Sequence, residues 1–224
     1  MAVDRIGDGF ALRSKGEILS HDGTNLTTLP FSDGMILTAR SSATNGLSWE
    51  ATPTSESQII ELVTTTTLTS GLVSSISFSN ITSGYEHLMV RARVCTHNSG
   101  YQQVLMRVNN VSTASYPYHY LYADSSTVSS TQSKTESEFP IGLCNPTTTS
   151  KSGLEVFIHS YANTSYYKNI NSFGCFNKGG SFPASLQAIG AFKSTSAITS
   201  LSFYISGDYF GAGTSFSLYG IKGS

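Results

Sequence analysis

The sequence predicts an all-β protein, in which a jelly-roll-like β-sandwich follows a short, extended, β-rich N-terminal region. Three observations predict this fold. Apolar and polar residues alternate with a period of two in many short segments, and turn-forming residues recur about every dozen positions. No segment longer than about two turns shows the apolar period of a helix. The large number of strand-like segments favours a jelly roll over an immunoglobulin-like arrangement.

The first 52 residues contain closely spaced turn signals, among them Gly7-Asp8-Gly9, His21-Asp22-Gly23 and Asn45-Gly46. These signals leave room only for strands of about four residues. Such strands bury too little apolar surface to offset the roughly 1–2 kcal/mol per residue that backbone ordering costs. We therefore expect this region to be ordered by copies of itself or by a docking partner.

A linker is predicted at Ala51-Thr52-Pro53-Thr54-Ser55, where Pro, Ser and Thr replace the strand pattern. We place the domain boundary there. Residues 1–54 form the N-terminal region with its linker, and residues 55–224 form the sandwich.

Alternation is clearest in Leu88–Val94, where Leu88, Val90, Ala92 and Val94 share one face while Met89, Arg91 and Arg93 share the other. This pattern is typical of a half-buried antiparallel strand. The run Thr64–Thr67 follows an apolar segment and predicts a Thr-rich strand. Further strands are predicted at Val104, Met106 and Val108; at Leu154, Val156 and Ile158; at Leu201, Phe203 and Ile205; and at Phe216 and Leu218.

The composition excludes several functional classes. The chain has 38 Ser and 25 Thr among 224 residues, but only 12% charged residues and a net charge of −1. Without a basic excess, nucleic acid is not an expected partner. No apolar run reaches the roughly 18–20 residues of a membrane span, so we expect no membrane insertion. Met1–Arg5 leads into no hydrophobic signal core, so we expect synthesis in a cytoplasm without export by a cleaved signal.

Neither a metal site nor a cofactor is predicted. Cys95, Cys144 and Cys175 are far apart and lack Cys-x-x-Cys spacing, so we expect small buried apolar side chains in a reduced compartment. The five histidines lie at no metal-ligand spacing from one another or from a cysteine.

Catalysis is not predicted either. Glu136 and Glu138 would lie on one side of a strand about 7 Å apart, a separation used by inverting glycosidases. We favour the alternative, two solvated carboxylates on an exposed strand or loop. The sequence contains no Gly-x-Ser-x-Gly nucleophile motif and no glycine-rich phosphate loop after a strand. The chain is therefore expected not to be an enzyme.

The strongest local feature is aromatic. Tyr116, Tyr118, Tyr120 and Tyr122 recur at a period of two, so a strand would display them as one stripe. Tyrosine combines a flat apolar ring with a hydroxyl, which suits internal packing, a subunit interface or stacking on a glycan. We favour internal packing, then an interface, then glycan contact. Pro117 suggests that this strand is at a sheet edge.

A second aromatic group lies in Tyr161–Tyr167, which we interpret as a hairpin tip and a candidate recognition loop. Together with the stripe, it supplies the candidate residues for contact with a receptor or a neighbouring subunit. These candidates are Tyr116, Tyr118, Tyr120, Tyr122, Tyr161, Tyr166 and Tyr167.

The ending FGAGTSFSLYGIK is the most specific of several segments that point to a known family. It is similar to a terminal signature of the fibre and capsid-decoration proteins of tailed bacteriophages, which the chain resembles. Arg40 departs from the family pattern, which often has Asp at that position. The other segments that carry the resemblance are Gly34–Trp49, Ser77–Leu88, Tyr161–Lys168 and Ala197–Leu201.

The resemblance implies a virion structural protein, usually a homotrimer, that is made in the bacterial host cytoplasm and placed on the particle exterior. It implies a thin N-terminal part bound to other virion proteins of the tail, baseplate or capsid, and a sandwich that points outward. The apolar residues expected to contact the particle are Phe10, Leu12, Ile18, Leu19, Leu37 and Trp49.

Three functions remain open at this point. The first is a short trimeric tail fibre whose sandwich tip binds a host-surface glycan or protein. The second is a capsid-decoration or head-fibre protein that dresses or stabilises the shell. The short N-terminal region favours this alternative. About 50 residues span at most about 170 Å when fully extended, which is less than a long-reach fibre needs. The third is a glycan-degrading spike that uses Glu136 and Glu138.

Overall fold

The computed structural model describes residues 18–21, 23–29, 35–43, 46–51, 59–98, 100–124, 126–146, 151–178 and 182–223. The chain divides into two compact units, Met1–Ser57 and Gln58–Ser224. Among the described residues every regular element is a strand, so the all-β class is confirmed, whereas the jelly-roll topology stays a prediction.

The N-terminal unit contains two antiparallel hairpins. Their strands are four or five residues long, as the spacing of the turn signals predicts. Gly23 and Gly46 lie in the turns with φ of 98° and 71°, a backbone conformation that favours glycine. The first hairpin pairs β1 (Ile18–His21) with β2 (Leu26–Leu29), and the second pairs β3 (Met35–Ala39) with β4 (Leu47–Ala51).

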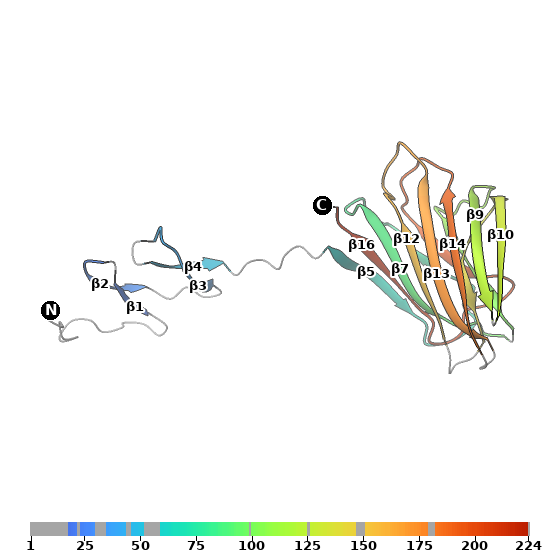
Figure 1. Ribbon diagram of the computed structural model, residues 1–224, viewed down its shortest axis with the longest axis horizontal. Helices are drawn as coiled ribbons and strands as arrows, with labels where there is room; N and C mark the ends of the chain where they lie inside the picture. The colour runs from blue at the N-terminus through green and yellow to red at the C-terminus, as the bar shows by residue number, and fades with distance from the viewer. Residues whose placement is uncertain are drawn as a thin grey trace. The chain divides into compact units, whose positions relative to one another are not determined.

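The second unit contains a large antiparallel sheet of eight strands in the order β10-β9-β14-β13-β12-β7-β16-β5 (Figure 1). The predicted Thr-rich strand is its outermost strand, β5. The strands are β5 (Ile60–Thr67), β7 (His87–Val94), β9 (Tyr116–Asp124), β10 (Thr127–Glu136), β12 (Ser152–Ile158), β13 (Lys168–Lys178), β14 (Phe182–Phe192) and β16 (Ser215–Ile221).

A smaller antiparallel sheet has the order β11-β8-β15-β6. Its strand β11 packs against β12, β13, β14 and β9 of the large sheet, so the two sheets enclose the core between them. The strands are β6 (Ser75–Phe78), β8 (Gln102–Val108), β11 (Phe139–Cys144) and β15 (Leu201–Ile205).

Alternating residues face this core, as the period of two predicts. In β7, Leu88, Val90 and Val94 are buried while Arg91 and Arg93 are exposed. The core-facing positions of the other segments that the sequence singled out are buried as well, but Met89, which the alternation predicts to face outward, is also buried. The buried positions include Val104, Met106, Val108, Leu154, Val156, Ile158, Leu201, Phe203, Ile205, Phe216 and Leu218.

One cysteine departs from the expectation. Cys95 and Cys144 are buried, but Cys175 is exposed. In β13, Ile170, Ser172, Gly174 and Phe176 are on the core face, so the side chain at position 175 faces outward. The prediction of three buried cysteines is therefore wrong for Cys175.

The ending that carries the resemblance forms β16, the strand next to the edge strand β5. The ring of Tyr85 packs directly over Gly220 of β16, where an added Cβ would overlap the ring. The Tyr85 hydroxyl donates to Glu61 Oε2 over 3.1 Å, and Lys222 Nζ donates to Glu61 Oε1 over 2.6 Å. The hydrogen bond from Lys222 lowers the pKa of Glu61. The Tyr-Gly-Ile-Lys sequence thus fastens β16 to β5.

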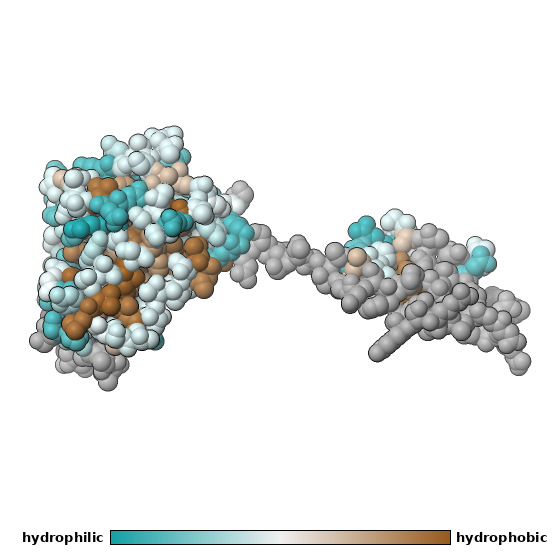
Figure 2. All heavy atoms as spheres, turned by 180° about the vertical axis from the view of Figure 1, so that it is seen from behind, coloured by the Kyte–Doolittle hydropathy of each residue, from teal (hydrophilic) through white to brown (hydrophobic). Residues whose placement is uncertain are grey.

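The surface of the sandwich unit reflects the abundance of Ser and Thr. Most of the residues visible in Figure 2 are pale, the colour of intermediate hydropathy, and strongly hydrophobic or hydrophilic residues gather in patches. In the part of the chain that the structure describes, no helix is long and apolar enough to cross a membrane.

Candidate functional site

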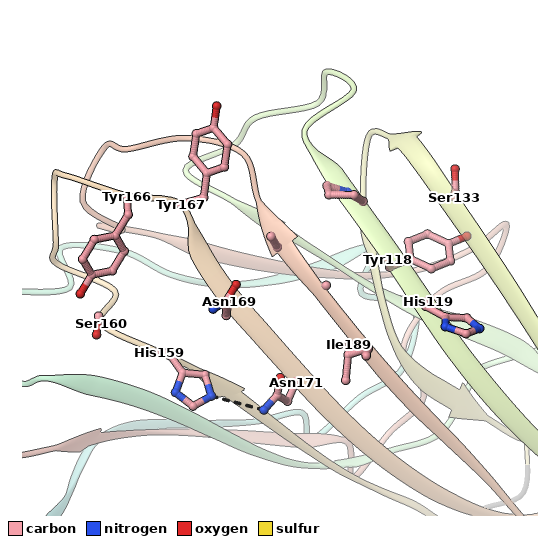
Figure 3. A pocket seen from close by; sticks show the side chains of 13 residues that line it. Tyr118, His119, Ser133, His159, Ser160, Tyr166, Tyr167, Asn169, Asn171 and Ile189 are labelled. Atoms are coloured by element: carbon pink, nitrogen blue, oxygen red, sulfur yellow. Dashed lines mark hydrogen bonds between the residues drawn. The ribbon is translucent and has the colours of Figure 1, made fainter.

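A concavity of about 670 Å³ lies on the face of the large sheet that points away from the small sheet (Figure 3). Its volume is within the range of about 300–1,000 Å³ that is typical of ligand sites. Residues from four strands and one loop surround it. They are Pro117, Tyr118, His119, Ser133, His159, Ser160, Tyr166, Tyr167, Asn169, Asn171, Ile189, Gly190 and Ala191.

Three neighbouring strands form the floor. Ile189 of β14 is paired with His119 of β9 on one side and with Asn171 of β13 on the other, so these three residues form a row across the sheet. In the next row, Ala191 is paired with Asn169. Their side chains point outward because the residues that alternate with them are buried in the core. The row of His119, Ile189 and Asn171 therefore presents an apolar side chain between two polar ones.

The loop between β12 and β13 forms one wall of the concavity. It contributes His159, Ser160, Tyr166 and Tyr167, and the two tyrosines are 51% and 55% exposed. Figure 3 shows these tyrosines above the floor residues Asn169 and Asn171. Two rings are therefore available beside the polar floor for contact with a ligand.

Buried polar contacts hold this loop in place. The Tyr161 hydroxyl donates to the Thr82 carbonyl, and Ile198 N donates to the Tyr161 carbonyl over 2.9 Å. Lys168 is fully buried, and its Nζ lies 3.2 Å from the carbonyl of Tyr166. The same Nζ donates to the carbonyls of Ser194 and Thr195 over 3.3 and 2.8 Å.

Lys168 therefore acts as a structural cation. Burial lowers the pKa of this ammonium group. Three carbonyl oxygens match its three donors, which offsets part of the desolvation cost. Because one of these carbonyls belongs to Tyr166, the buried ammonium group fixes the backbone beside an exposed ring.

Two histidines meet at the base of the loop. The ring centroids of His87 and His159 are 5.6 Å apart, and Ser160 N donates to His87 Nδ1 over 3.0 Å. His159 Nε2 lies 3.3 Å from Nδ2 of Asn171, which can only donate, so Nε2 accepts and is unprotonated in this arrangement. Burial and the nearby His87 both lower the pKa of His159.

The tyrosine stripe serves mainly for internal packing. Tyr116 is fully buried, and its hydroxyl accepts from Val108 N over 2.8 Å and lies 3.0 Å from the Val111 carbonyl. Burial raises the pKa of Tyr116 to about 12. Tyr118 and Tyr120 are half-buried, and their rings stack 5.7 Å apart. Half-buried Tyr122 stacks on the ring of Phe176.

Two of the candidate contact residues are corrected by these findings. Tyr116 and Tyr161 have no exposed surface, and their hydroxyls donate to the carbonyls of Val108 and Thr82, so neither can touch a receptor or another subunit. Three others, Tyr118, Tyr166 and Tyr167, line the concavity. The structure thus brings residues of both aromatic groups to one place.

The prediction that Pro117 indicates an edge strand is wrong. Strand β9 lies between β10 and β14. The ladder between β9 and β10 is interrupted between Ser133 and Glu136, opposite Pro117, and the pairing with β14 ends at Tyr118. Proline is tolerated because this irregularity requires no ladder hydrogen bond from it.

The sequence did not predict the floor residues of the concavity or the histidine of its wall. His119, His159, Asn171 and Ile189 come from four different segments, and no local pattern distinguishes them from other outward residues. The only available signal was the alternation in β13, which predicts that Asn169 and Asn171 share its outer face.

The carboxylates proposed for a glycan-degrading spike lie elsewhere. Glu138 Oε1 forms an ion pair with Arg107 over 2.5 Å, and Glu136 is an exposed residue of β10. Neither residue lines the concavity. Among the described residues, no group of three or more His, Cys, Asp or Glu is placed to hold a metal ion.

The residues expected to contact the particle are only partly described. Ile18 and Trp49 are half-buried and Leu37 is exposed. Leu19 lies in β1, but its side chain is outside the description, and Phe10 and Leu12 lie outside the described residues. Their role in attachment stays a prediction.

Comparisons of the chain with family models, with curated proteins and with solved structures found no match. Function is therefore inferred from the residues of the chain itself.

Proposed function

We propose that the chain is a bacteriophage virion structural protein, most simply a short trimeric tail fibre. In this proposal the N-terminal unit binds other virion proteins, and the sandwich binds a host-surface glycan or protein through the concavity beside Tyr166 and Tyr167. The observation that carries the binding role is this concavity itself, because exposed aromatic rings and uncharged polar groups converge there on a rigid sheet.

The rigidity of the site supports recognition. The rings of Tyr166 and Tyr167 project from a loop whose backbone is held by Lys168 and Tyr161. A loop that is already fixed loses little conformational entropy when it binds. A fibre tip needs this property because it has to bind through a small contact area.

The apolar residues of the N-terminal unit support assembly. Met35, Ile36 and Leu37 are 42%, 43% and 38% exposed on the two-stranded hairpin β3–β4. An isolated two-stranded hairpin is only marginally stable in water. Contact with further copies or with a particle protein would cover these three side chains, which fits a trimeric attachment region.

Capsid decoration is the second candidate, and the short reach of the N-terminal unit favours it. The described strands fold back as two hairpins, so these strands reach less far than an extended chain of the same length. A head-fibre protein needs no long shaft.

We propose binding without catalysis. No described residue that lines the concavity is Asp or Glu, so it lacks the paired carboxylates that glycoside hydrolysis uses. A glycan-degrading spike would lose polysaccharide cleavage on Glu136→Gln or Glu138→Gln, whereas we expect no cleavage to begin with.

The location of the protein on particles that carry it tests the proposal. Antibody labelling seen by electron microscopy should mark the tail, and purified full-length chain should compete with adsorption of those particles to their host. Label on the capsid together with intact tails in particles that lack the chain would replace the fibre by a decoration protein. Label on neither structure would overturn both candidates.

A further inference from the structure

We propose that the concavity binds an uncharged oligosaccharide rather than an anionic glycan or a charged peptide. This inference rests on the proposed host-binding function and names the ligand class of the same site. The observation behind it is that no Asp, Glu, Lys or Arg occurs among the 13 described residues that line the concavity. Charged ligands are ordinarily held by opposite charges, because desolvating an unpaired charge is costly.

The chemistry of the lining suits a sugar ring. A pyranose has apolar C–H faces and a rim of hydroxyls, so it stacks on aromatic rings and hydrogen-bonds to amides at its edge. Tyr166 and Tyr167 supply the rings, at 51% and 55% exposure. Asn169 and Asn171 supply exposed amides on the floor below them.

Two basic groups beside the concavity, Lys168 and His159, have partners within the protein. Lys168 is buried, and its ammonium group donates to three carbonyl oxygens. The lowered pKa of His159 favours its neutral form, and Nε2 of its ring accepts from Asn171. Neither group is arranged to pair with an anion in the concavity.

Two smaller depressions adjoin the concavity and extend the area available to a chain of sugars. A second depression of about 160 Å³ shares His119 and Ile189 with the concavity and continues along β9 and β14 past Leu121 and Gln187. Its described lining is also uncharged. A third depression of about 240 Å³ shares Ser160 and Tyr166, so the Tyr166 ring stands between two hollows. The one acidic residue in the described lining of this third depression is Glu86.

The test uses full-length chain on an array of purified bacterial surface polysaccharides, sorted into uncharged and acidic repeats. We expect binding only to uncharged polysaccharides, with a signal that stays constant from about 50 mM to about 500 mM salt, because no charge pairing is involved. Tyr166→Ala and Tyr167→Ala should each weaken binding about tenfold. Tyr209→Ala is the matched control, because Tyr209 is 43% exposed outside the concavity.

A variant that adds a charge to the floor of the concavity sharpens the test. Ile189→Arg places a cation at the centre of the floor, and it should abolish binding to the uncharged polysaccharide. Binding of the unmodified chain only to acidic polysaccharides, equal loss in the Tyr209→Ala control, or no binding to any polysaccharide would each overturn the inference. The inference fails separately from the fibre proposal, because labelling of the tail and competition for adsorption would still hold if the receptor were a protein.

Discussion

Tyr161 and Tyr166 lie five positions apart in the connection between β12 and β13, but they have opposite roles. Tyr161 is fully buried, and its hydroxyl donates to the Thr82 carbonyl. Tyr166 is 51% exposed, and its ring stands at the concavity. The residue type is the same, so the difference lies in whether a backbone acceptor is within reach of each hydroxyl. A buried tyrosine needs a partner for its hydroxyl, and only the inner position has one.

The comparison also shows how the loop is built. The buried side chains of Tyr161 and Lys168 anchor the two ends of the loop. The residues between them can therefore stay exposed at the surface while their backbone stays ordered. Anchors should therefore control stability, and the exposed rings should control binding. Three predictions separate these two roles, and a fourth concerns the dependence of stability on pH.

The largest effect is expected for Tyr161→Ala. Removing this ring leaves a cavity in the core and should lower the free energy of unfolding by about 3–5 kcal/mol. Tyr166→Ala is the matched control and should change it by less than about 0.5 kcal/mol. Urea unfolding of the full chain, followed by near-ultraviolet circular dichroism, measures both. Equal losses in the two variants would abolish the distinction between anchor and contact residue.

Lys168→Met should destabilise the protein by about 1–3 kcal/mol, because it leaves three carbonyl oxygens without their donor. It should also increase hydrogen exchange in residues 163–167, since the Tyr166 carbonyl is released. Lys193 is exposed, so Lys193→Met serves as the control. Unchanged exchange in that segment would show that the ammonium group does not fix the loop.

Tyr161→Phe isolates the hydroxyl. It removes the hydrogen bond to Thr82 and keeps the ring, so we expect a loss of about 0.5–1.5 kcal/mol. Tyr166→Phe should be neutral in the same unfolding measurement. A Tyr161→Phe variant as stable as the parent would mean that the ring alone anchors the loop.

The smallest effect concerns pH. The folded state lowers the pKa of His159 below 6.5, its ordinary value, so the folded protein binds this proton less readily than the unfolded chain. This contribution to stability is present above pH 6.5 and is lost as the pH falls through the folded pKa. Unfolding measured at about pH 7.5 and about pH 5 should show a smaller loss in His159→Gln than in the parent. An identical loss would assign the pH dependence to other groups.

Much of the fold could be predicted from the sequence because alternation with a period of two is a local signal. The alternation predicts the burial of Leu88, Val90 and Val94, and the glycines Gly23 and Gly46 predict their turns. The contact residues could be predicted only in part. The pattern identifies Tyr166 and Tyr167 as aromatic residues of a loop, but it does not distinguish Tyr161 in the same motif from them. Its burial depends on Thr82, a residue 79 positions away.

The sequence by itself determined the all-β class, the positions of the strands and the surface rich in hydroxyl groups, since each depends on residue type and on neighbours in the chain. Only the tertiary structure decided which strands lie side by side. Strands β9, β14 and β13 are adjacent, so His119, Ile189 and Asn171 form one row although their segments are far apart in the chain. Strand pairing is a long-range interaction, and the concavity exists because of that pairing.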